Sequence, residues 1–222
     1  PEPFEPMYLP FTITPDPISF EVYEKGFNRA MQAIQNGDTY LINLTYATPI
    51  SGEFSLHQAY SIAKADYKVY WEGKFTVFSP DQFVSIKNGV ILTFPMKGTI
   101  DAGIPDAENV LLNDLKEQEE HATVVDLLRN DLSIVANKVT VARYRFISKI
   151  KTREKTFLQT STEIRGQLPE DYLDHLGDIF QSLVPAGSVT GAPKKRTVEL
   201  INEIEPEKGG YYTGVCGVFD GK

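Results

Sequence analysis

The heptapeptide TFPMKGT, residues 93–99, places Lys97 between a proline and a glycine, directly after the β-branched run GVILTF. A lysine amine has an ordinary pKa of about 10.4 and becomes a nucleophile when burial or a nearby cation lowers that pKa. Pro95 and Gly98 would fix the direction of a turn at the end of a strand and so place Lys97. The stretch therefore predicts either a reactive amine or an exposed turn lysine.

A second candidate is the acidic stretch KEQEEHATVVDLLRND, residues 116–131. On a helix, Glu120 shares a face with Val124 and Leu127, where a carboxylate needs a cation beside it. Mg²⁺ is a suitable cation because it prefers carboxylate oxygens and keeps water or substrate oxygens as further ligands. The alternative is that residues 116–121 form a solvated helix face. His121 has no partner in the sequence and is expected to be structural.

The third candidate is the loop PAGSVTGAPKKR, residues 185–196. Its glycines would let backbone N–H groups point into one concavity, and Pro193 suits the first position of a following helix. Such a loop binds a phosphate or a carboxylate. Its spacing differs from G-x-x-x-x-G-K-[ST], so nucleotide binding is not supported. The alternative is a capped helix start after a flexible loop.

The composition excludes several classes of partner. The formal net charge of −8 argues against nucleic acid, which needs a basic surface. A small anionic substrate remains allowed, with positive charge supplied locally by a lysine, by N–H groups or by a metal ion. No apolar run is long enough to span a membrane. The single cysteine, Cys216, excludes an internal disulfide framework, suits a reducing cytoplasm and is expected in the core.

The surrounding elements predict an α+β fold. Residues 1–18 hold six prolines and read as an extended arm. Helices are expected from Ser19 to Gly37 and over 107–135, 171–183 and 193–204. Strands are expected over 39–50, three times within 67–94, over 138–150 and 155–165, and at YYTGVCGVF. The strands follow one another with clustered helices between them, which favours α+β over a repeated βαβ unit.

The two ends of the sequence suggest a piece of a longer protein. The first residue is not methionine, and Asp220-Gly221 forms a hairpin-turn signal with no returning strand after it. We therefore expect residues 19–222 to be a catalytic domain that lacks its C-terminal part, and this chain alone to be inactive.

Five stretches together resemble the chorismate-utilising enzymes, in particular component I of aminodeoxychorismate synthase: GDTYLINLT, SPDQF, TFPMKGT, EEHATVVDLLRND and PAGSVTGAPKKRTVELINEIEPEKGGYYTGVCG. The resemblance implies stacked antiparallel β-sheets with helices on the outside and a site between the sheets that binds chorismate with Mg²⁺. It implies that Glu120 is a metal ligand. The substrate-binding residues that it implies are Gly187, Ser188, Thr190, Gly191, Tyr212 and Gly214.

The resemblance also implies a covalent mechanism for Lys97. Relatives that form anthranilate, isochorismate or salicylate carry a small residue in this position, whereas aminodeoxychorismate synthases carry lysine. The amine would attack ring C2 of chorismate, and ammonia would then add at C4, giving 4-amino-4-deoxychorismate for p-aminobenzoate and folate synthesis. Asp81 takes the position of the general acid. Ammonia would come from a separate glutaminase subunit, because this chain shows no cysteine–histidine nucleophile set.

Three positions depart from the family pattern. Asp81 replaces a longer glutamate, Phe94 stands where many relatives have arginine or glutamate, and Gln159 replaces a histidine. Glutamine donates a hydrogen bond but does not shuttle a proton. Asp81 and Gln159 leave open a catalytically inactive homologue that binds chorismate or a partner subunit. The other alternative is an anthranilate- or isochorismate-forming enzyme, against which Lys97 argues.

Overall fold

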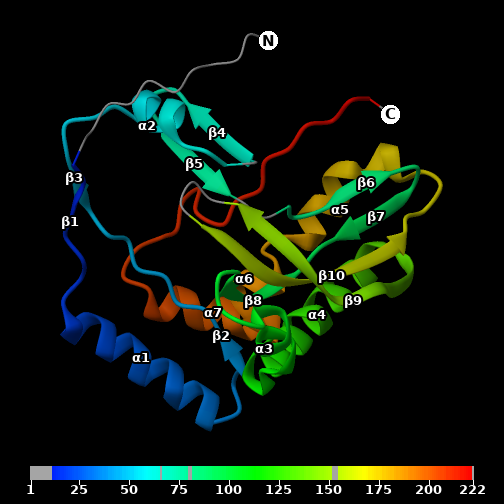
Figure 1. The fold of residues 1–222 in the computed structure, drawn as a ribbon, viewed down its shortest axis with the longest axis horizontal. Coiled ribbons are helices and arrows are strands. Elements are labelled where there is room, and N and C mark those ends of the chain that lie inside the picture. The colour runs from blue at the N-terminus through cyan, green and yellow to red at the C-terminus, as the bar shows by residue number, and fades with distance from the viewer. Residues whose placement is uncertain (1–11, 66, 80–81, 152–154, 222) are drawn as a thin grey trace.

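The computed structural model describes residues 12–65, 67–79, 82–151 and 155–221. Its centre is a five-stranded antiparallel sheet, and helices cover one face of this sheet (Figure 1). The expected α+β architecture is confirmed. Of the proline-rich arm, residues 1–11 lie outside the described residues, and the two-residue strand β1 (Thr14–Pro15) pairs with β3 (Ile50–Ser51).

The long strand β10 (Thr156–Gln167) organises the central sheet. One of its edges pairs with β7 (Val90–Thr93) and then with β8 (Met96–Asp101), and its other edge pairs with β9 (Asn137–Lys151). Strand β6 (Ser85–Lys87) adds to β7 through the expected turn. Asn88 and Gly89 take φ values of 52° and 72° in this turn, as a tight hairpin with two left-handed residues requires.

The remaining strands form two-stranded sheets. β4 (Tyr67–Trp71) pairs with β5 (Phe75–Ser79), so the segment 67–94 contains four strands where three were expected. β2 (Leu41–Ile42) pairs with β11 (Gly191–Ala192). The expected strand over 39–50 is wrong except at its two ends, because between Ile42 and Ile50 the described chain meets no neighbouring strand.

The helices begin where capping residues stand. Ser19 accepts a hydrogen bond from the Val22 N–H at the start of α1 (Phe20–Gln35). Ser55 forms a capping box at α2 (Leu56–Ile62), a helix that the sequence analysis did not predict. The others are α5 (Leu176–Leu183) after the 3₁₀ turn Tyr172–His175, α6 (Gly187–Thr190) and α7 (Lys194–Ile204).

The helix expected over 107–135 is two helices, α3 (Ala107–Asn113) and α4 (Leu115–Val135). Asp114 separates them because its backbone is extended, with ψ of 115°, while its carboxylate accepts the Glu117 N–H and caps α4. Pro193 is likewise the N-cap of α7 and not its first helical residue.

The main core lies between α4 and the sheet. Val124, Val125, Leu128 and Leu132 of α4 pack with Ile91 of β7 and Ile164 of β10, and α5 adds Ile179 and Leu183. Helix α1 contributes less than its apolar pattern suggests. Its small residues Gly26, Ala30 and Ala33 are buried, whereas the bulky side chains of Phe20, Tyr23, Phe27 and Met31 are exposed.

The C-terminal segment differs from expectation. Residues 205–221 contain no strand, so the strand predicted at YYTGVCGVF is wrong, and Cys216 is exposed and not in the core. The physical reason is that this segment has no hydrogen-bonded neighbour strand in the described chain. Its Tyr211 ring contacts β4 and β5, 4.9 Å from the Phe75 ring and 5.6 Å from the Trp71 ring, and its Glu205 carboxylate accepts the Thr45 N–H at 2.8 Å.

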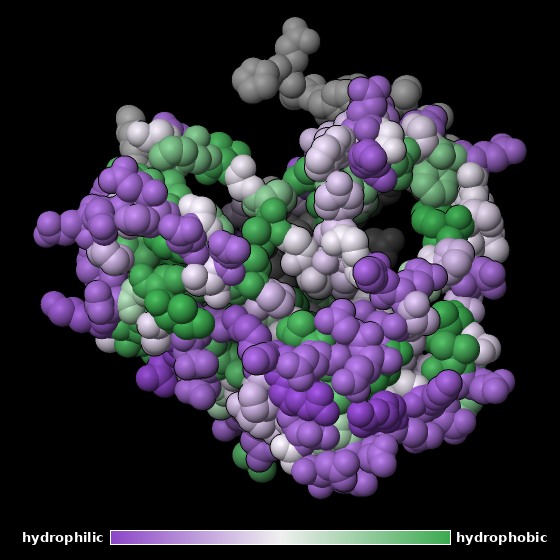
Figure 2. Space-filling view, turned by 180° about the vertical axis from the view of Figure 1, so that it is seen from behind, coloured by the Kyte–Doolittle hydropathy of each residue, from purple (hydrophilic) through white to green (hydrophobic). Residues whose placement is uncertain are grey.

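The surface is mixed in character. Seen from behind, its lower part is mostly hydrophilic, and apolar side chains reach the surface in separate patches (Figure 2). Among the described residues, no helix has both the length and the apolar content that crossing a membrane requires.

Two glycine substitutions should separate backbone strain from helix propensity. Gly191 has φ of +127°, and a Cβ there would lie 2.0 Å from the Leu41 carbonyl oxygen, so Gly191→Ala should destabilise the fold by at least about 2 kcal/mol. Gly177 in α5 has open space around it, so Gly177→Ala should be neutral or stabilise by up to about 0.5 kcal/mol. Urea unfolding of the full-length variants measures both, and equal effects would contradict the packing at Gly191.

Candidate active site

Lys97 lies inside strand β8 and not in a turn after a strand. Gln159 faces Thr99 and Thr160 faces Lys97, so Gly98 is an extra residue that forms a β-bulge, with φ of +73°. The Lys97 side chain is half-buried, which argues against the exposed turn lysine. Its backbone carbonyl accepts a hydrogen bond from the Thr160 hydroxyl.

Gly98 has a second role beside its bulge conformation. A Cβ at this position would lie 2.9 Å from Glu117 Oε2 and 3.0 Å from Leu111 Cδ1. The missing side chain therefore lets the Glu117 carboxylate approach the main chain next to Lys97. Glu117 was not among the residues predicted from the sequence, although its place one helical turn before Glu120 was the available signal.

Glu120 does not lie on the buried face of α4 as its spacing suggested. Its side chain is 46% exposed, and its Oε1 lies 3.6 Å from the Nζ of Lys116. Such an exposed ion pair contributes little to stability, so the carboxylate can exchange this partner for another cation. Within the described residues, no group of three acidic, histidine or cysteine side chains stands close enough to hold a metal ion alone.

His121, the next residue, is fully buried between two threonines of β10. Its Nε2 lies 2.6 Å from the Thr162 hydroxyl oxygen, and its Nδ1 lies 3.4 Å from that of Thr160. Burial, with a smaller contribution from the positive charge of Arg145, lowers the pKa of the ring to about 4. The imidazole is therefore neutral at neutral pH, which agrees with the structural role expected for it.

The loop that was expected to bind an anion already holds one from the protein itself. The Gly187 N–H donates to Asp131 Oδ2 at 2.8 Å, and the Lys194 ammonium lies 2.6 Å from Asp131 Oδ1. The Asp131 side chain is only 5% exposed. Asp131 of α4 therefore occupies the Gly187 N–H in this structure, and the predicted contact of Gly187 with substrate stays a prediction.

The other loop residues are also held by neighbouring main chain. Asn43 donates from its side chain to the Ser188 carbonyl at 3.3 Å and from its backbone N–H to the Thr190 carbonyl at 3.0 Å. The Thr190 hydroxyl donates to the Ala186 carbonyl, and the Gly191 N–H donates to the Gly187 carbonyl. Ser188 is half-buried, and within the described residues its hydroxyl has no hydrogen-bond partner.

Two further predicted residues belong to the exposed C-terminal segment, and a third lies outside the described residues. Tyr212 is 62% exposed, and its backbone forms a turn by donating to the Gly209 carbonyl. Gly214 belongs to the same exposed segment, where its N–H donates to the Tyr211 carbonyl. Asp81 lies outside the described residues, so its predicted role as the acid stays a prediction.

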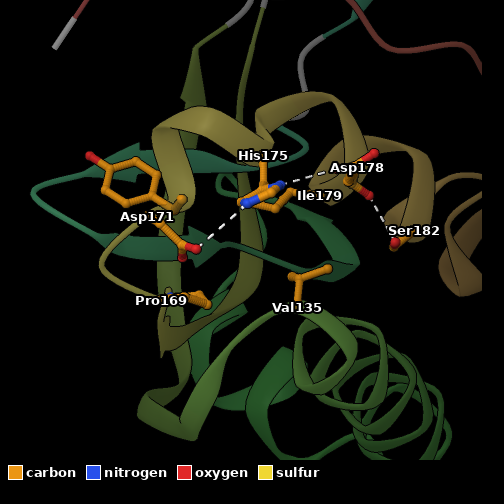
Figure 3. Close-up of a pocket in the computed structure, with 8 residues that line it drawn as sticks. Val135, Pro169, Asp171, His175, Asp178, Ile179 and Ser182 are labelled. Atoms are coloured by element: carbon orange, nitrogen blue, oxygen red, sulfur yellow. Dashed lines mark hydrogen bonds and ion pairs between the residues drawn. The ribbon is translucent and has the colours of Figure 1, made fainter.

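A cavity of about 420 Å³ lies elsewhere, where the C-terminal end of α4 meets α5 (Figure 3). Its lining includes Val135, which follows Glu117 by about 27 Å along the helix axis. His175 also lines the cavity. Its Nε2 lies 3.5 Å from Asp171 Oδ2 and its Nδ1 lies 3.3 Å from Asp178 Oδ2, and all three side chains are exposed. This cavity is therefore not the site at Lys97.

The buried ion pair gives a test of the loop. Asp131→Asn keeps the shape but leaves the Lys194 ammonium without its charge partner, so the free energy of unfolding should fall by about 3 kcal/mol. Asp126→Asn on the same helix removes an exposed pair with Arg129 and should change it by less than about 0.5 kcal/mol. Denaturant unfolding measures both, and an unchanged Asp131→Asn protein would contradict the buried pair.

Comparisons with known proteins show the family of the chain. The family model of the chorismate binding enzymes matches residues 10–222. A protein of Haemophilus influenzae described as an uncharacterized PabA-like protein is 49% identical over 98% of the chain. Aminodeoxychorismate synthase component 1 of Bacillus subtilis is 32% identical over 88% of the chain. The chain spans 66% of the first of these relatives and 44% of the second.

The fold matches a solved structure as well. Anthranilate synthase component I of Streptococcus pneumoniae superimposes with a TM-score of 0.68 at 27% identity, covering 90% of this chain and 46% of that one. The fold class expected from the sequence is therefore confirmed.

Proposed function

The chain belongs to the family of chorismate binding enzymes, and we propose that it carries the chorismate-aminating site of an aminodeoxychorismate synthase. Similarity alone does not choose the reaction, since the chain resembles both an aminodeoxychorismate synthase component and an anthranilate synthase component. The observation that carries the proposal is Lys97, half-buried beside the bulge of β8. An amine in this position supplies the nucleophile that amination through a covalent intermediate needs.

The proposed reaction has two balanced steps. The neutral Lys97 amine attacks ring C2 of chorismate, both ring double bonds shift, and the C4–O bond breaks, so that the C4 hydroxyl leaves as water with the proton that the amine gives up. Ammonia then forms a bond to C4, both double bonds shift back, and the C2–N bond breaks to restore the lysine, which takes up the proton that ammonia loses. The sum is chorismate plus ammonia giving 4-amino-4-deoxychorismate plus water. The covalent bond replaces one difficult substitution by two easier ones.

The leaving hydroxyl needs a proton, because hydroxide is a poor leaving group. Asp81 remains our candidate for this acid. We assign the ammonia to a separate glutaminase subunit, as for the family members that the sequence resembles.

For the substrate carboxylates, the loop offers less than its glycines suggest. The Gly187 and Gly191 N–H groups both donate hydrogen bonds to acceptors within the protein. We therefore assign the Ser188 hydroxyl, half-buried on this loop, as the polar group that binds a chorismate carboxylate. Tyr212, which is exposed, remains our candidate for the contact with the enolpyruvyl group, and Gly214 remains a further candidate for substrate binding.

The carboxylates Glu117 and Glu120 of α4 fit Mg²⁺. This ion accepts one or two carboxylates together with water and substrate oxygens, so it does not require a protein cage. Glu120 is accessible, and Glu117 lies one helical turn before it and next to Gly98. Bound Mg²⁺ would neutralise a carboxylate of chorismate. Glu120 would hold the ion.

Replacing the lysine tests the proposal directly. In the full-length protein with chorismate, Mg²⁺ and an ammonium salt, Lys97→Ala should lower the amination rate by at least about 10³-fold, because the nucleophile is lost. The matched control is Lys149→Ala, an exposed lysine of β9 in the same sheet, which should keep the wild-type rate.

Product mass spectrometry provides the measurement. A product with the mass of 4-amino-4-deoxychorismate, which retains the pyruvate, supports the proposed amination. Anthranilate with released pyruvate would contradict the proposed amination. Wild-type rates in Lys97→Ala would exclude the covalent role. Unchanged chorismate in the presence of the glutaminase subunit would leave a chorismate-binding homologue that is not an enzyme.

The metal assignment has its own test. A chelator should abolish the amination activity, and Glu120→Gln should raise the Mg²⁺ concentration for half-maximal activity by at least about tenfold. Glu119→Gln, a neighbouring exposed position of α4, should leave that concentration unchanged. Equal Mg²⁺ dependence in the two variants would show that Glu120 is not the ligand.

A further inference from the structure

A continuous chain of buried hydrogen bonds joins α4 to the main chain of Lys97. The Thr160 hydroxyl donates to the Lys97 carbonyl, and His121 lies between the hydroxyls of Thr160 and Thr162. All three of these side chains are 0% exposed. The Thr162 hydroxyl also accepts the Arg145 N–H at 3.0 Å.

The direction of each hydrogen bond follows from donor counting. A carbonyl only accepts, so the Thr160 hydroxyl gives its single proton to Lys97 and can only accept from His121. The ring must therefore carry its proton on Nδ1. In a neutral ring Nε2 is then an acceptor, and the Thr162 hydroxyl donates to it.

Both ends of this series of hydrogen bonds, at Thr160 and at Arg145, lead to the β-bulge at Gly98. On one side, Thr160 holds the Lys97 carbonyl where the ladder between β8 and β10 shifts register. On the other side, Arg145 has φ of 46° and donates from its guanidinium to the carbonyls of Leu111 and Leu112. Leu111 is the residue whose side chain packs against Gly98.

We propose that His121 is a positioning residue for Lys97, acting through Thr160 on the peptide that carries the lysine. This inference rests on the proposed function only in taking Lys97 as the nucleophile. His121 does not touch substrate. By fixing the Lys97 carbonyl, it fixes the direction in which the side chain leaves the strand. Misplacing a reacting group by about 1 Å lowers a rate by roughly 100-fold.

The variants separate positioning from folding. The amide nitrogen of Asn reaches the place of Nδ1, so His121→Asn keeps the donor to Thr160, whereas the longer Gln places its amide near Nε2. Thr160→Val removes the hydroxyl that holds Lys97 and keeps the shape. Leu132→Ala changes a buried position farther along α4 and destabilises the fold without altering the hydrogen bonds of His121 and Thr160.

In the full-length protein, His121→Gln and Thr160→Val should lower kcat about 100-fold with little change in KM, and His121→Asn should stay within about tenfold of wild type. Leu132→Ala should keep kcat at a temperature where it is folded. Wild-type kcat in His121→Gln and Thr160→Val would overturn the proposal. So would losses of kcat that follow thermal stability across all four variants.

Nuclear magnetic resonance provides a readout that needs no turnover. The ¹⁵N spectrum of His121 should show the proton on Nδ1, and the Lys97 carbonyl ¹³C signal should shift in Thr160→Val and His121→Gln but not in Leu132→Ala. A proton on Nε2, or an unshifted carbonyl, would overturn the proposal even if amination is shown. If the wild type aminates no chorismate, the proposed function fails, and these signals alone decide whether His121 positions Lys97.

Discussion

The packing of helix α4 across the central sheet is the constraint on which the candidate site depends. Val124, Val125, Leu128 and Leu132 face Ile91 and Ile164, and burying each such side chain stabilises the fold by about 1.5–3 kcal/mol. A helix fixed in this way is a rigid rod. It carries Glu117 beside Gly98 of β8, Glu120 one turn farther on, and Asp131 beside the loop 187–191, so the packing of one helix places the parts of both regions.

Polar groups then fix the register of this apolar contact. His121 and Asp131 are buried on α4 about 15 Å apart, and each is satisfied by a different element, β10 in one case and α6 with Lys194 in the other. An apolar interface alone tolerates sliding and repacking, whereas an unsatisfied buried polar group is costly. Each contact therefore disfavours a shift of the helix, and the geometry around Lys97 is held along with it.

Local signals in the sequence predicted much of this fold. Ser19, the Asn88-Gly89 turn and the long strands on either side of residues 152–154 act through neighbouring residues, and the structure agrees with them. Lys97 was predicted as a candidate nucleophile, but the β-bulge beside it was not predicted, because the bulge depends on the register of β8 against β10.

The parts that the sequence did not reveal depend on distant contacts. The partners of His121 lie 39 and 41 residues away, and the carboxylate that occupies the Gly187 N–H lies 56 residues away. No spacing pattern predicts such pairs. The apolar pattern around Cys216 failed for a related reason, since the described chain offers no strand for it to pair with.

The central claim is that the Lys97 amine forms a bond to chorismate, and intact-protein mass spectrometry tests it most directly. The full-length protein is mixed with chorismate and Mg²⁺ while ammonia is withheld, then quenched and digested. Our account predicts a species heavier by chorismate less one water, with the added mass on the peptide that contains Lys97. An unmodified Lys97 peptide in a protein that aminates chorismate once ammonia is added would contradict the account.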